Sequence, residues 1–133
     1  MNFVDTNYFL RLVLGDVESQ FVEVKRVFEE GMIGEIKLFT SLVVFFEVYW
    51  VLTSFYRQKK EKIISVLEDI LKMSFVALPE RIILFKALGL FGQTNLSLED
   101  CFNVFYAEEY KSEKFLTFDR KLAHFFSRGL QKK

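Results

Sequence analysis

The sequence predicts a single three-layer α/β/α domain over residues 1–133, with helices on both faces of a mostly parallel central sheet of four or five strands. Short apolar segments alternate with longer segments whose apolar residues recur at helical spacing. Strands that are separated by helices favour parallel crossover connections. At 133 residues, the chain is also long enough to bury one hydrophobic core.

The first third of the chain predicts a strand followed by two helices. Phe3 and Val4 form the strand, which ends on Asp5. A short helix over residues 8–14 ends at Gly15, because glycine is common just after a helix. The second helix has polar or glycine residues at its predicted boundaries: Asp16 or Ser19 at the start, and Gly31 and Gly34 at the end.

The middle third predicts two strands and two helices. Residues 35–40 alternate enough for a strand, and Ser41 can cap the long helix that carries Glu47. The charged run at residues 57–60 separates this helix from an amphipathic one, and a brief strand over residues 75–77 follows.

The last third predicts two helices, a strand and a terminal helix. Pro79 suits the first turn of the first helix, because its missing N–H would be unpaired there anyway. Residues 89–95 are expected to form a loop, and Ser97 caps a helix that runs to about Tyr110. Residues 114–117 form the last strand.

The composition predicts a soluble protein of the cytoplasm with no membrane association. Cys101 is the only cysteine, which excludes an internal disulfide and fits a reducing compartment. The N-terminus lacks the basic segment of a signal peptide, and Glu47 interrupts the longest apolar run. The formal net charge is zero, so a nucleic-acid contact needs a local basic patch. The candidate basic residues are Arg57, Lys59, Lys60, Lys62, Arg120, Lys121 and Arg128.

Glu47 is the most informative charged residue. Its helical neighbours three and four residues away are all apolar: Val43, Val44, Trp50 and Val51. A carboxylate on such a face is expected to be buried or nearly so, and it then needs a cation, a basic side chain or a proton to compensate it. The alternative to a metal is a salt bridge to an arginine such as Arg11.

Three further acids are predicted to lie near the same edge of the sheet. Asp5 and Asp119 each follow a predicted strand, and the carboxyl ends of parallel strands meet at one edge. Helix capping is the alternative for both, and it does not exclude metal binding. Glu99 and Asp100 flank the apolar stripe of their helix, about 100° apart. Periodicity favours Asp100 as the acid that faces the sheet, whereas helix-dipole complementation fits Glu99 better.

Convergence of four acids would require bound protons or a divalent cation. The four are Asp5, Glu47, Asp100 and Asp119. Two carboxylates about 4 Å apart repel by roughly 4 kcal/mol at an effective dielectric near 20. An all-oxygen ligand set suits Mg²⁺ or Mn²⁺, and the lack of a Cys/His cluster argues against structural zinc. Such a metal would activate water and stabilise the charge on a phosphodiester during an in-line displacement.

The pattern resembles the PIN domain, and most closely the VapC-type toxins of prokaryotic toxin–antitoxin pairs. The resemblance rests on Asp5-Thr6-Asn7 after an N-terminal strand, an acid in the apolar third helix, an acid that opens a late helix, and Thr117-Phe118-Asp119. It implies a Mg²⁺- or Mn²⁺-dependent ribonuclease of single-stranded RNA. Members are usually homodimers, commonly held inactive by a small antitoxin protein whose tail covers the acidic pocket.

The resemblance also assigns roles to individual residues. The four acids match the family's acidic quartet, and the polar residues that support them are Thr6, Asn7 and Thr117. One departure is that Asp100 is flanked by Glu99 and Cys101 and followed by bulky side chains, where the family usually has Ala-Asp-Ala and small residues.

Two rival functions remain open from the sequence. A non-catalytic PIN-like module could keep the acidic pocket and bind RNA or protein, and its thermal stability would then not respond to Mn²⁺. A metal-dependent phosphatase that acts on small phosphate esters would cleave a chromogenic monoester but not RNA.

Overall fold

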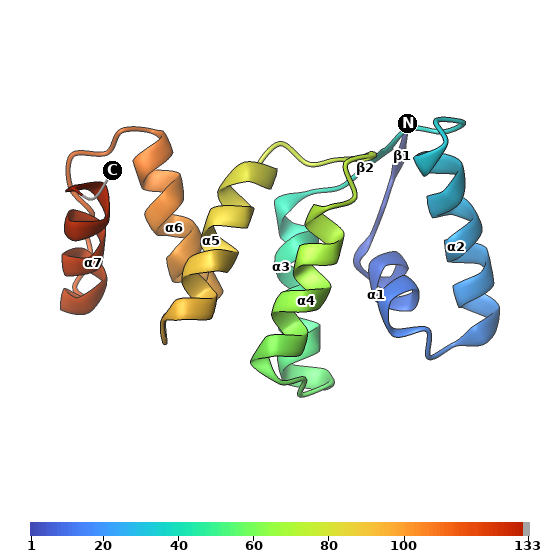
Figure 1. Cartoon of the computed structure of the whole chain (residues 1–133), viewed down its shortest axis with the longest axis horizontal. Helices are drawn as coiled ribbons and strands as arrows, with labels where there is room; N and C mark the ends of the chain where they lie inside the picture. The colour runs from blue at the N-terminus through green and yellow to red at the C-terminus, as the bar shows by residue number, and fades with distance from the viewer. Residues whose placement is uncertain (132–133) are drawn as a thin grey trace. The chain divides into compact units, whose positions relative to one another are not determined.

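The computed structural model describes residues 1–131, with side chains described up to residue 126. The chain divides into two compact units, Met1–Glu80 and Arg81–Lys133 (Figure 1). The expectation that residues 1–133 form one domain stays a prediction. Seven α-helices, one π-helical segment and three strands make up the described residues, so the α/β class and the parallel sheet are confirmed.

The sheet lies in the first unit. Its strands are β1 (Asn2–Phe3), β2 (Leu38–Phe39) and β3 (Val76–Ala77), in the order β1-β2-β3. Both pairings are parallel, with Phe3 opposite Phe39 and Phe39 opposite Ala77. β1 has the predicted length but begins one residue earlier than expected, and β2 and β3 are shorter than the predicted segments 35–40 and 75–77 but lie within them.

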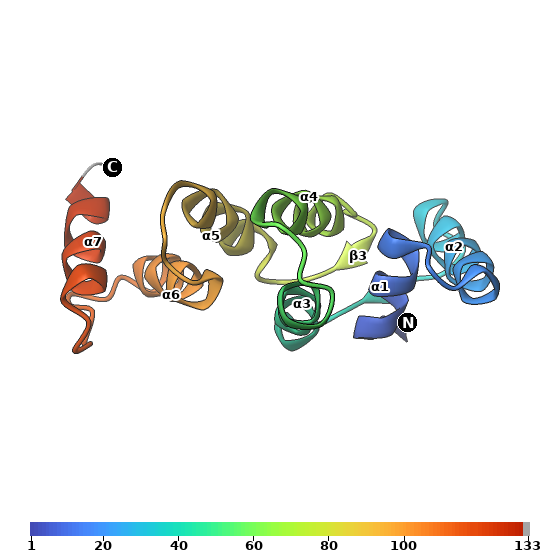
Figure 2. The same cartoon turned by 90° about the horizontal axis from the view of Figure 1, so that it is seen from below.

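Four α-helices and the π-helical segment surround this sheet. They are α1 (Thr6–Leu14), α2 (Glu18–Met32), α3 (Leu42–Trp50), η1 (Val51–Phe55) and α4 (Lys60–Leu71). α1 lies between α2 and α3 and packs on both (Figure 2). The first unit's core includes Phe9, Phe45, Leu52 and Leu67, all of which are fully buried. In η1, the backbone N–H of Tyr56 donates to the carbonyl of Val51, five residues earlier, at 3.1 Å.

The predicted boundaries of α2 need correction. Val17, rather than Asp16 or Ser19, occupies the N-cap position, because the Asp16 carboxylate binds Arg11 instead. Gly31 lies inside the last turn, where it is buried, and a Cβ built on it would lie 2.6 Å from Cδ1 of Leu38. The close approach of β2 therefore explains this glycine better than helix termination does.

The second unit contains three helices: α5 (Arg81–Gln93), α6 (Leu98–Glu109) and α7 (Arg120–Gln131). The prediction of a loop over residues 89–95 is wrong, since α5 continues to Gln93. Burial of Leu90 and Phe91 against α6 outweighs the helix penalty of Gly89, which is about 1 kcal/mol relative to alanine. Pro79 lies two residues before α5 rather than in its first turn.

The prediction of four or five strands is wrong, because the described residues contain three. Residues 114–117 adopt no regular structure, and Leu116 and Phe118 are almost fully exposed. A strand needs a neighbouring strand for its backbone hydrogen bonds. The described part of the second unit is otherwise helical and offers none.

Among the described residues, no helix combines the length and the apolar character that a membrane span requires.

Candidate active site

Thr40 fixes the carboxyl ends of all three strands just before Asp5. Its hydroxyl donates to the carbonyl of Val4 at 2.8 Å, and its backbone N–H donates to the carbonyl of Ala77 at 3.0 Å. The N–H of Val4 in turn donates to Phe39 at 2.8 Å. Thr40 is only 6% exposed, so these bonds are shielded from water. The sequence does not single out this residue, because its partners Val4 and Ala77 are far from it along the chain.

Asp5 occupies the N-cap position of α1 but does not use its side chain as a cap. Its backbone is extended, and no hydrogen bond joins its carboxylate to the first turn of the helix. The residue is exposed. The capping interpretation is therefore not supported for Asp5, and both carboxylate oxygens remain available to a ligand at the carboxyl end of the sheet.

Thr6 carries a buried hydroxyl that lacks a hydrogen-bond partner. Its side-chain oxygen finds none among the described residues, and the residue is 6% exposed. A buried unsatisfied hydroxyl destabilises a fold by about 1–3 kcal/mol. This orphaned group directly beside Asp5 fits a site whose occupant supplies the missing hydrogen bond. Asn7, the next residue, is exposed on α1.

Glu47 is exposed, so the prediction that it is buried is wrong. Ser41 caps α3 as predicted, with its hydroxyl accepting from the N–H of Val44 at 3.2 Å. The buried side of α3 carries Val44 and Val48, whereas Glu47 lies on the other side with the exposed side chain of Val43. Apolar neighbours in the sequence did not imply burial, because α3 leaves part of its apolar surface exposed.

Arg11 does not neutralise Glu47 either. Its Nη1 donates to Asp16 Oδ1 at 2.7 Å, and the hydroxyl of Tyr56 donates to the other oxygen of Asp16 at 3.1 Å. Hydrogen bonding to Tyr56 and Asp16 raises the pKa of Arg11. Desolvation acts to raise the pKa of Asp16, but the hydrogen bonds from Arg11 and Tyr56 outweigh it and hold that pKa below its ordinary value. The salt-bridge alternative for Glu47 is thus not supported within residues 1–80.

Asp100 and Glu99 open α6 after the predicted cap. The hydroxyl of Ser97 accepts from the N–H of Asp100 at 3.1 Å, and both acids are partly exposed in the first turn. Cys101, the next residue, is fully buried. Oε1 of Glu99 is buried, but the sheet belongs to the other unit, so the preference for Asp100 as the acid that faces the sheet stays a prediction.

Asp119 caps α7. Its Oδ1 accepts from the N–H of Leu122 at 3.0 Å, which confirms the capping alternative. The hydroxyl of Thr117 accepts from the N–H of Asp119 at 3.1 Å and so supports the turn. Capping engages one of the two carboxylate oxygens, so it leaves the other for a ligand.

Each unit therefore holds two of the four predicted acids. Asp5 and Glu47 lie in the first unit, and Asp100 and Asp119 lie in the second. Neither unit, as far as its residues are described, gathers three or more His, Cys, Asp or Glu side chains that could hold a metal ion by itself. The convergence of the four acids stays a prediction.

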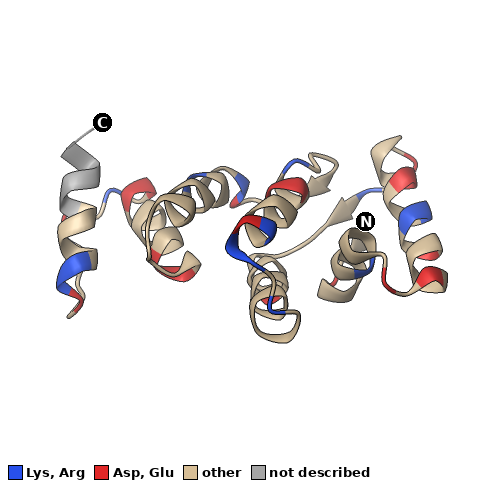
Figure 3. Ribbon diagram, turned by 60° about the horizontal axis from the view of Figure 1, so that its bottom comes forward, with Lys and Arg blue, Asp and Glu red and all other residues tan. Residues whose placement is uncertain are grey.

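The first unit contains a short basic segment between η1 and α4. Arg57 and Lys59 lie in the loop after η1, and Lys60 and Lys62 lie in the first turn of α4. Figure 3 shows Lys and Arg along the segment that leads into α4. Arg57, Lys59 and Lys62 are exposed, and exposed cations can contact a phosphate backbone.

Comparison with known proteins gives one match. The family model described as the PIN domain matches residues 3–125, a stretch that contains all four acids, the strands β2 and β3, and the second residue of β1. No curated protein and no solved structure matches the chain. Because the match covers well over half of the 133 residues, the chain belongs to the PIN domain family.

Proposed function

We propose that this chain is a metal-dependent endoribonuclease that hydrolyses phosphodiester bonds in RNA. PIN domains are generally nucleases, and PIN nucleases generally use divalent metal ions. The observation that carries the proposal is the carboxylate of Asp5, which no helix cap uses, beside the orphaned hydroxyl of Thr6 at the carboxyl end of a parallel sheet.

The donor set fits Mg²⁺ or Mn²⁺. Carboxylate and hydroxyl oxygens are hard ligands, which suit these cations better than they suit zinc. Asp5, Asp100 and Asp119 would hold the ion, and Glu47 would complete the set directly or through water. A bound divalent cation supplies positive charge that stabilises a phosphodiester under attack.

Three side chains would each have a distinct role in the reaction. The exposed carboxylate of Glu47 accepts a hydrogen bond from the attacking water and orients it. The hydroxyl of Thr6 has no hydrogen-bond partner among the described residues, so it donates a hydrogen bond to the occupant of the site. Thr117 holds the backbone of Asp119, so that the second carboxylate oxygen keeps a fixed direction.

The biological setting that we propose is the toxin of a type II toxin–antitoxin pair, with a homodimer as the active form and a small antitoxin protein as its inhibitor. This part rests on the resemblance to VapC-type toxins. Exposed apolar side chains on the first unit, such as Val43 on α3 and Phe55 on η1, give a protein partner a surface to bury.

The test is an RNA cleavage assay with Mg²⁺ or Mn²⁺, with and without chelator. Asp5→Asn should abolish cleavage while the urea midpoint stays unchanged, because the native side chain makes no capping hydrogen bond. Asp69→Asn, at an exposed acid on α4, is the matched control and should cleave normally. Mn²⁺ should also raise the Tm of the native chain and not that of Asp5→Asn, since a ligand that binds only the folded state stabilises it. Full activity in Asp5→Asn would overturn the proposal, and RNA binding without cleavage in the native chain would favour the non-catalytic module.

A further inference from the structure

A cavity of about 440 Å³ lies between α1 and α2 in the first unit. Asn7, Tyr8 and Arg11 line it from α1, and Ser19, Gln20 and Glu23 line it from α2. This volume falls within the range of small-ligand sites, which is roughly 300–1,000 Å³. The proposed nuclease mechanism assigns no role to this cavity.

The cavity begins within one helical turn of Asp5. The N–H of Tyr8 donates to the backbone carbonyl of Asp5 at 3.1 Å, and Asn7 is the second residue of α1. The Asp5-Thr6-Asn7 motif therefore runs from the proposed catalytic acid directly into the lining of the cavity. A chain molecule with one unit at Asp5 could extend its neighbouring unit into this space.

The lining combines apolar surface with groups that both donate and accept hydrogen bonds. Val24, a further lining residue, is buried, whereas Tyr8, which also lines the cavity, is exposed. The side chains of Asn7, Ser19 and Gln20 each offer a donor and an acceptor. A nucleobase has the matching character, because its faces are apolar enough to stack on aromatic rings while its edges carry donors and acceptors.

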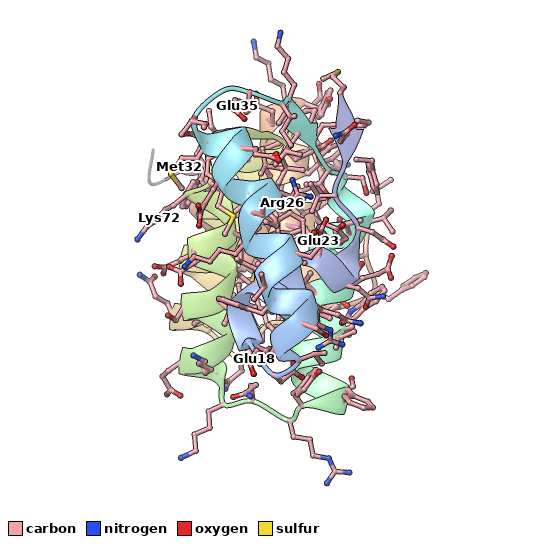
Figure 4. The ribbon with its side chains drawn as sticks, turned by 90° about the vertical axis from the view of Figure 1, so that its right-hand side faces the viewer. Glu18, Glu23, Arg26, Met32, Glu35 and Lys72 are labelled. Carbon is pink, nitrogen blue, oxygen red and sulfur yellow. The ribbon has the colours of Figure 1, made fainter. Side chains whose placement is uncertain are left out.

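The two charged residues that line the cavity have opposite signs, and each is ion-paired with a neighbouring side chain. Arg11 is bound to Asp16 at 2.7 Å, and Glu23 is bound to Arg26 at 2.8 Å. Figure 4 shows Glu23 and Arg26 next to each other on α2. One paired cation and one paired anion leave the lining without net charge. This balance argues against a phosphate or a metal ion as the occupant and favours a neutral heterocycle.

We propose that this cavity is a nucleobase subsite, which holds one base of a single-stranded RNA beside the phosphodiester that is cleaved. The inference rests on the proposed function, since it deepens the same site by stating how the substrate is held. In the subsite, the base lies against Val24 and Tyr8, and its edge bonds to the amide and hydroxyl groups of Asn7, Ser19 and Gln20.

The experiment measures RNA binding separately from cleavage. The full chain carrying Asp5→Asn is titrated in Mg²⁺ against a fluorescent single-stranded RNA, with Kd read by anisotropy. Adding Ser19→Phe, which fills the cavity from an exposed position, should raise Kd at least tenfold, the scale of losing one stacked base. Adding Gln20→Ala should raise Kd about three- to tenfold, as for the loss of one hydrogen bond. The control is Gln93→Ala, an exposed glutamine at the end of α5 outside the cavity lining, which should leave Kd unchanged.

Abasic nucleotides identify the base that occupies the cavity. In the parent protein, which carries Asp5→Asn alone, removing one particular base from the RNA should raise Kd by about the same factor as Ser19→Phe does. Removing the same base should not raise Kd further when the protein also carries Ser19→Phe. Circular dichroism and the urea midpoint confirm that each variant is folded.

Two results would overturn the subsite: parent-like affinity in Ser19→Phe, or additive losses at every abasic position. If the native chain nevertheless cleaves RNA in a chelator-sensitive way, the proposed function stands and only the subsite fails. If the native chain neither cleaves nor binds RNA, both proposals are overturned.

Discussion

Removal of the Thr40 hydroxyl tests whether the strand ends hold Asp5 in position. Thr40→Val keeps the shape of the side chain but deletes the donor that reaches the carbonyl of Val4 at 2.8 Å. Thr40 and Val4 are both buried, so water cannot replace the lost bond. Leaving a buried carbonyl unsatisfied is expected to lower the free energy of unfolding by about 1–3 kcal/mol.

Thr53→Val provides a matched control. The hydroxyl of Thr53 donates to the carbonyl of Tyr49 over the same 2.8 Å, but Thr53 is exposed. Water can therefore replace this bond, and the change in the free energy of unfolding should stay within about 0.5 kcal/mol. The two variants differ mainly in whether the residue that loses its hydroxyl is buried, as Thr40 is, or exposed, as Thr53 is.

Urea denaturation monitored by circular dichroism measures both variants, and RNA cleavage kinetics give the functional result. Because Thr40 acts through the position of Asp5, Thr40→Val should lower kcat more than it changes KM, whereas Thr53→Val should change neither. Equal losses of stability in the two variants would refute the reasoning. Thr40→Val with native kcat would show that Asp5 does not depend on this hydrogen bond.

Three further predictions follow from local geometry. Gly31→Ala should destabilise the chain by about 1 kcal/mol net in urea denaturation, because overpacking against the buried Leu38 exceeds the gain in helix propensity; Gly89→Ala, which meets nothing within 4 Å, should stabilise it by about 0.5–1 kcal/mol, and the same sign for both would contradict this account. The pKa of Asp16 is lower in the folded chain, so its pairing contributes stability that is present above its unfolded pKa of about 3.9 and is lost as the pH falls through the folded value. Urea midpoints measured from neutral to acidic pH should reveal this loss of stability. Asp16→Asn should abolish this part of the pH dependence. Asp119→Ala should lose about 1 kcal/mol of stability with the helix cap, whereas Asp119→Asn should keep the cap and lose metal-dependent cleavage; native cleavage in Asp119→Asn would exclude this carboxylate as a ligand.

The features that sequence reasoning predicted correctly are determined by local chemistry. Ser41 and Ser97 cap the helices that follow them because a hydroxyl at a helix start accepts from an N–H three residues later. Gly15 ends α1 because its left-handed backbone, with φ of 60°, is accessible to glycine at little cost. These outcomes need only a few neighbouring residues, so a single sequence is enough to predict them.

The features that were missed depend on distant parts of the chain. Glu47 has apolar neighbours in the sequence, but which side of α3 is covered depends on the elements that pack against it. Gly31 looked like a helix end because its contact with Leu38 depends on the return of β2 beside α2. Thr40 connects three strands that are far apart in the sequence, and no local pattern reveals that connection.

The wide turn of η1 has a consequence for the cavity between α1 and α2. Its hydrogen bonds span five residues rather than four, so this stretch contains one residue more than regular α-helical winding would need. Deleting one residue from it would turn every later side chain by about 100° around the axis. Tyr56 would then turn away from Asp16, and the ion pair of Asp16 with Arg11 at the cavity wall would lose the hydrogen bond that Tyr56 donates to it. The number of residues in one turn thus determines whether Tyr56 can support an ion pair whose arginine belongs to a separate helix.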